Sequence, residues 1–170
     1  MGHPEPFGLE FIGIGNEQWE TEKVDFFRRY TLFEEAIHAK YPEKAIGCSE
    51  YGCEAMPNLH SSKPRRGDHT EEYQAVYHES LIRQLFSRKY LWATHVWNMF
   101  DFGADARNEG GENGQNHKGL MTFDRKYKKD SFYAYKAWLS DEPFVHLCSK
   151  RYIDRVEDVT KVTVYSNQPA

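Results

Sequence analysis

The chain has 170 residues, which is enough for one domain of about 100–200 residues. A net charge of −4 with scattered basic residues argues against nucleic acid as a partner, and no apolar run approaches the roughly 18 residues of a membrane span. Eight histidines and three cysteines show no zinc-binding spacing, so neither a metal nor a cofactor is expected.

The chain begins with a strand followed by a helix. Residues 9–15 (LEFIGIG) form a short apolar run that ends in glycine and precedes Asn16 and Glu17. Residues 21–40 have apolar side chains at spacings of three and four, which predicts one buried helix face. That face carries Val24, Phe27, Tyr30, Phe33 and Ile37.

A second strand and helix follow. Residues 44–49 (KAIGCS) form a short strand that ends at Glu50. After a polar loop that contains His60, Asp68 and Glu71 resemble a capping box, which predicts a helix from there to about Arg88. Its predicted inward face comprises Tyr73, Val76, Tyr77, Leu81 and Leu85.

The third unit leads into a short tail. Residues 90–100 (YLWATHVWNMF) are apolar almost throughout, as expected of a strand buried on both faces. A glycine-rich loop at 103–119 precedes a helix at 130–139, and alternating valines near 160–164 predict an exposed antiparallel strand. The last helix is expected to place inward Phe132, Tyr135 and Trp138.

Alternating strands and helices predict an α/β fold with a parallel sheet. Three βα units are fewer than the eight of a (β/α)8 TIM-barrel, which needs roughly 250 residues. The alternatives are a small open sheet and a partial barrel. Either one leaves unpaired sheet edges, through which we expect low stability and self-association. With no signal peptide visible at the N-terminus, the cytoplasm is the default location.

Two carboxylates stand at strand ends, where parallel α/β folds place reactive residues. Glu17 follows the first predicted strand and Glu50 the second. A retaining glycosidase uses two carboxyl groups about 5–5.5 Å apart, one as nucleophile and one as acid and base. Among 26 acidic residues this placement is weak evidence on its own.

Four motifs in order resemble glycoside hydrolase family 2, the β-galactosidase and β-glucuronidase family. The resemblance covers residues of about 48–160 and corresponds to strands seven and eight of that family's barrel. It implies that Glu50 is the nucleophile and that Trp97 forms an aromatic wall of the sugar site. The motifs are SEYG at 49–52, GDHTEEYQ at 67–74, HVWNMFDF at 95–102 and NHKGLMTFDRKYKKDSFYAYKAW at 116–138.

The same resemblance places further residues near the sugar. Asn116 and Lys118 are similar to the carboxylate-binding pair of β-glucuronidases. Relatives thought to be β-galactosidases share the NxKG sequence, so the motif does not assign a uronic acid. His60, in the loop after Glu50, is a weaker candidate, and for a histidine there a surface position is the alternative.

Residues 1–47 instead resemble glycoside hydrolase family 51, the α-L-arabinofuranosidases, around strand four. That resemblance implies that Glu17 is the acid and base and that Asn16 contacts the sugar. We therefore expect an incomplete barrel domain over 1–143, made of 1–47 and 48–143, followed by an exit segment at 144–170 that begins a β-sandwich.

Together these features predict a retaining, β-galactosidase-like glycosidase whose partner is a carbohydrate substrate. The alternatives are an α-L-arabinofuranosidase and a truncated or chimeric fragment that binds sugar without catalysis. Binding in the last case would depend on Trp97.

Overall fold

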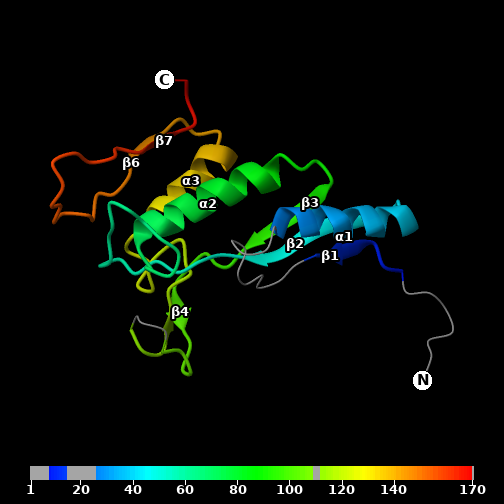
Figure 1. Ribbon diagram of the computed structural model, residues 1–170, viewed down its shortest axis with the longest axis horizontal. Helices are drawn as coiled ribbons and strands as arrows, with labels where there is room; N and C mark the ends of the chain where they lie inside the picture. Colours follow the sequence, from blue (N-terminus) through cyan, green and yellow to red (C-terminus); the bar gives the residue numbers. More distant parts are fainter. Residues whose placement is uncertain (1–7, 15–25, 109–111, 170) are drawn as a thin grey trace. The chain divides into compact units, whose positions relative to one another are not determined.

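The computed structural model describes residues 8–14, 26–108 and 112–169. They form an α/β protein whose main sheet has three parallel strands in the order β1-β2-β3, as the sequence predicts (Figure 1). The strands are β1 (Phe11–Gly13), β2 (Ala45–Tyr51) and β3 (Leu91–Val96). The chain divides into two compact units: the first comprises Met1–Tyr51 and Leu85–Val96, the second Gly52–Gln84 and Trp97–Ala170.

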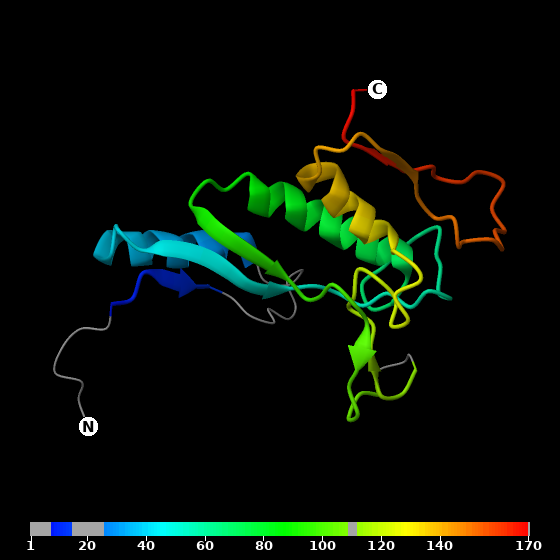
Figure 2. The ribbon, with the colours of Figure 1, turned by 180° about the vertical axis from the view of Figure 1, so that it is seen from behind.

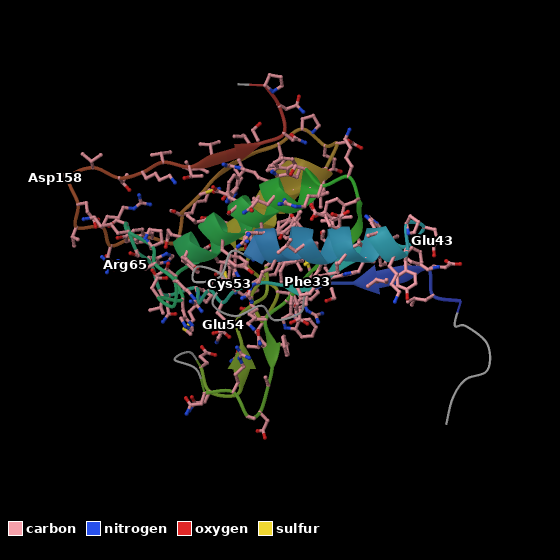
Figure 3. All side chains as sticks on the ribbon, turned by 45° about the vertical axis from the view of Figure 1, so that its right-hand side comes forward. Phe33, Glu43, Cys53, Glu54, Arg65 and Asp158 are labelled. Carbon is pink, nitrogen blue, oxygen red and sulfur yellow. The ribbon has the colours of Figure 1, made fainter. Side chains whose placement is uncertain are left out.

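The first unit combines the sheet with α1 (Phe26–Lys40). Tyr30 of α1 is buried, as predicted, but Phe33, marked in Figure 3, is 58% exposed, so the predicted inward face is too wide. Val24 lies outside the described residues. The prediction that β3 is buried on both faces is also wrong, because Trp92 is half exposed and covered only in part by Phe11. A sheet of three short strands buries only a narrow stripe of side chains.

The second unit is built on α2 (Glu71–Phe86) and α3 (Asp130–Leu139), which lie side by side in Figures 1 and 2. The predicted inward face of α2 is wrong in part: Leu85 is buried as expected, but Val76 is 43% exposed. The fully buried positions on α2 include polar residues, and Gln74 and His78 bond to Ser131 and Tyr135 of α3. Along this helix pair, buried hydrogen bonds thus accompany apolar packing, to which Ile82 and Ala134 contribute.

The helix boundaries follow local capping. α2 begins at Glu71 because the Thr70 hydroxyl accepts a hydrogen bond from the backbone N–H of Tyr73 at 3.1 Å. The predicted capping box is therefore wrong, and Asp68 instead accepts a bond from the backbone of Thr70. The bounds of α3 match the prediction, but Trp138 is 54% exposed and does not point inward.

Two antiparallel pairs complete the second unit. β4 (Phe102–Gly103) pairs with β5 (Gln115–Asn116) in the glycine-rich loop. β6 (Val145–Leu147) pairs with β7 (Val164–Ser166), which confirms the antiparallel strand expected in the tail. This pair lies beside α3 (Figure 1). None of the helices in the described part of the chain is long and apolar enough to cross a membrane.

Candidate active site

Glu50 lies in β2, one residue before the strand ends, and is half-buried. The β2–β3 pairing is irregular between Cys48 and Tyr51, and such irregularities re-aim side chains. His95 of β3 contacts the Cys48 carbonyl oxygen at 3.2 Å and so ties the strands together beside Glu50. Glu17 lies outside the described residues, as does Asn16, so the separation of the two carboxyl groups stays a prediction.

The second unit brings Trp97, Asn116 and Lys118 onto neighbouring backbone segments. The N–H of Asn98 donates to the carbonyl oxygen of Lys118 at 3.1 Å, and the N–H of Leu120 donates to that of Asn98 at 2.9 Å. Asn116 pairs with β4 through β5. We call residues 97–98 and 116–120 the loop platform.

Each of the three predicted side chains has a different environment. Trp97 is 40% exposed and meets Phe102 edge to face, so its indole keeps surface on which a sugar ring can stack. Asn116 is buried, and its Oδ1 accepts a hydrogen bond from the N–H of Lys118 at 3.0 Å. Lys118 is half-buried. The amide therefore shapes the turn that presents the lysine.

A buried ion pair supports the loop platform from beneath. The Lys129 ammonium donates to Asp101 Oδ1 at 2.8 Å and to the carbonyl oxygens of Ala55 and His117 at 2.7 and 3.0 Å. Both side chains are almost inaccessible to solvent. Burial lowers the pKa of Lys129, and the Asp101 carboxylate opposes that shift. One cation therefore holds three loops together.

Two glycines allow backbone segments to approach one another closely around the Lys129–Asp101 ion pair. A Cβ on Gly119 would overlap the backbone N of Asp101, and the Gly119 N–H donates to the carboxylate of Asp101 at 2.9 Å. A Cβ on Gly52 would overlap the carbonyl oxygen of Trp97. The glycine of the NHKG motif is thus needed for backbone packing.

A second buried carboxylate fixes the glycine-rich loop. Glu54, labelled in Figure 3, accepts two hydrogen bonds on one oxygen from the Arg107 guanidinium, at 2.8 and 3.2 Å. His69 lies 3.1 Å from its other oxygen.

His60 is engaged elsewhere: it contacts Glu72 at 3.0 Å and stacks on Tyr152. These contacts give His60 a structural part in its loop.

Sequence patterns did not identify Asp101, Lys129 or Glu54. A charged residue normally indicates a solvent-exposed position, and the partners are 28 residues apart for Asp101 and Lys129 and 53 apart for Glu54 and Arg107. Asp101 and Lys129 lie within the quoted motifs at 95–102 and 116–138, but the motifs alone do not indicate that the two side chains pair.

Known proteins with similar sequences and structures are glycosidases. The chain is 45% identical over 125 residues to a β-glucuronidase of Bacteroides fragilis, which covers 70% of this chain and 18% of that protein. It matches the crystal structure of an FMN-binding β-glucuronidase from Faecalibacterium prausnitzii L2-6 with 44% identity and a TM-score of 0.75, over 94% of this chain and 23% of that one. A putative β-galactosidase structure from Bacteroides fragilis has 30% identity and a TM-score of 0.74, over 95% and 24% of the two chains.

The chain thus spans about a fifth of the length of these relatives. The family model described as "Alpha-L-arabinofuranosidase 1 domain" matches residues 1–88, just over half of the chain. That range contains both predicted carboxylates, Glu17 and Glu50. The chain is glycoside hydrolase-like and belongs to the family of the α-L-arabinofuranosidase 1 domain.

Proposed function

We propose that the chain carries the catalytic carboxylates of a retaining glycoside hydrolase whose substrate is a β-glucuronide. The observation that supports this substrate is the loop platform, in which the half-buried residue Lys118 and the exposed residue Trp97 lie on backbone segments joined by hydrogen bonds. Relatives named β-glucuronidase, at 45% and 44% identity, favour the same substrate over the β-galactoside expected from the sequence.

In this proposal each residue has one task. Glu50 attacks the anomeric carbon and forms a glycosyl-enzyme, while Glu17 protonates the leaving oxygen and later activates water. Lys118 attracts the uronate carboxylate as a point charge, and Trp97 stacks on the sugar face. The mechanism requires the two carboxyl groups to lie about 5–5.5 Å apart, with the three parallel strands forming part of a (β/α)8 barrel.

The test is hydrolysis of 4-nitrophenyl glycosides by the purified chain. A β-glucuronide should be turned over faster than a β-galactoside, and Glu50→Gln should lower kcat by at least about 10³-fold because the nucleophile is lost. Glu43→Gln is the matched control, since this carboxylate in the same unit is 60% exposed. Turnover that survives Glu50→Gln would show that the nucleophile assignment is wrong.

A second candidate is hydrolysis of α-L-arabinofuranosides, which the family match over residues 1–88 favours. Comparing aryl α-L-arabinofuranoside with aryl β-glucuronide separates the two activities. A third outcome is sugar binding without turnover, which is consistent with a chain that spans a fifth of its relatives. It would produce a sugar-dependent change in tryptophan fluorescence while all three glycosides stay intact.

A further inference from the structure

Three different metal-binding side chains meet in the second unit. Asp130 is the first residue of α3, His146 lies in β6, and Cys148 follows that strand. Residues two apart on a strand point to the same side, which brings His146 and Cys148 toward the start of α3. All three are less than 9% exposed.

The candidate ligand atoms lie close enough together for one small ion to bind all three after small shifts. The candidate ligand atoms all lie within 4.8 Å of one another, and His146 Nε2 is 2.9 Å from Asp130 Oδ1. Tetrahedral zinc, with bonds of about 2.0–2.3 Å, holds its ligand atoms roughly 3.3–3.7 Å apart. Binding therefore requires the nitrogen and oxygen to separate by about half an ångström as the ion replaces the shared proton.

The surroundings already orient the ligands. Asp130 Oδ2 accepts a hydrogen bond from the N–H of Ser149 at 2.6 Å, which leaves Oδ1 directed at His146. The imidazole of His146 stacks on Tyr133 with ring centroids 3.5 Å apart. Such second contacts hold ligands in place before an ion arrives.

The donor types suit a divalent ion. Asp130 supplies a carboxylate oxygen, His146 an imidazole nitrogen and Cys148 a sulfur, all of which zinc accepts as ligands. A divalent ion would then be neutralised by one carboxylate and one thiolate.

The site also has an entry path. Asp130 and Cys148 line a cavity whose wall includes Glu79, Tyr165 and Ser149. The hydroxyl of Tyr165 donates to Glu79 at 2.5 Å within that wall. We propose that Asp130, His146 and Cys148 bind one zinc ion, whose fourth coordination position faces this cavity and holds water.

The test uses Co²⁺, which accepts the same ligands as Zn²⁺ and has visible absorption bands. Added to the reduced chain, Co²⁺ should give a thiolate charge-transfer band that saturates at one ion per chain and disappears when Zn²⁺ is added. Cys148→Ser should remove the band, whereas the control Cys53→Ser should keep it. His146→Gln should weaken Co²⁺ binding by at least about tenfold.

The unmodified chain provides a readout that does not depend on folding of a variant. Zn²⁺ should slow alkylation of Cys148, measured by peptide mass spectrometry, by at least about tenfold and leave Cys48 unchanged. Equal alkylation with and without Zn²⁺, or a full charge-transfer band in Cys148→Ser, would overturn the site. The three ligands are separate from Glu17 and Glu50, so either result leaves the proposed hydrolysis untouched.

Discussion

Lys129 and Asp101 form an ion pair of 2.8 Å whose side chains are 1% and 2% exposed. The ammonium also binds the carbonyl oxygens of Ala55 and His117. A buried pair of this kind is costly to break from one side, because the remaining charge has no compensation. It therefore couples the shape of the loop platform to the stability of the second unit.

Removing the cation should destabilise the protein strongly. We expect Lys129→Met to lower the free energy of unfolding by about 3–5 kcal/mol, measured by urea denaturation, because Asp101 stays buried without its partner. The control is Lys126→Met, since the Lys126 side chain is 73% exposed and should change stability by less than about 1 kcal/mol. A double variant with Asp101→Asn should lose less than the sum of the two single losses.

Gly119 should tolerate no side chain. A methyl group there overlaps the backbone of Asp101, so we expect Gly119→Ala to lower the free energy of unfolding by about 1–3 kcal/mol. Gly103→Ala is the matched control, because a Cβ at position 103 meets no atom within 4 Å. Equal unfolding midpoints for the two variants would contradict the close approach.

His78 should make stability depend on pH. Burial lowers its pKa from 6.5 to about 3, so the folded state keeps the ring neutral while the unfolded chain binds a proton below about pH 6.5. Stability should therefore fall as the pH drops from 6.5 toward 3, with a slope from this group of at most about 1.4 kcal/mol per pH unit.

The variant His78→Asn isolates this effect. The Asn side-chain amide can still hydrogen-bond to the Tyr135 hydroxyl that contacts His78 Nδ1, but it does not titrate. We expect a shallower decline of the unfolding midpoint between pH 6.5 and 4.5 than in the unmodified chain. Burial lowers the pKa of His146 in both proteins, so the contribution of His146 to the pH dependence cancels in the comparison. Parallel curves would show that His78 is protonated in the folded state.

Apolar patterns in the sequence predict the three parallel strands and the bounds of α3, because this signal is local to each segment. The buried face of α2 was not predictable in this way. Glu71, Gln74 and His78 are buried there because partners far along the chain satisfy them, Arg151 and Tyr135 among them. Hydrophobic periodicity carries no information about such long-range hydrogen bonds.

The candidate site shows the same difference between features that local sequence predicts and features that depend on long-range contacts. Motif resemblance identified Trp97, Asn116 and Lys118, and the structure places them on neighbouring segments of the loop platform. It did not identify Lys129, whose role depends on a carboxylate 28 residues away. The motifs predict which residues approach a substrate, whereas the buried contacts that hold those loops depend on the tertiary fold.

Lys118 should discriminate between uronides and neutral glycosides. If its ammonium binds a uronate carboxylate, Lys118→Met should lower kcat/KM for an aryl β-glucuronide by about 10–10³-fold, because one charged partner is left without compensation. The same change should alter kcat/KM for an aryl β-galactoside much less, since that sugar has no carboxylate.

The ratio of the two kcat/KM values is the decisive measurement, because loss of folded protein lowers both equally. Lys126→Met controls for the loss of one positive charge from the second unit, and it should leave the ratio unchanged. A Lys118→Met variant with an unchanged ratio would assign Lys118 to loop structure. The uronate specificity would then have to come from another cation, while Glu50 could still be the nucleophile.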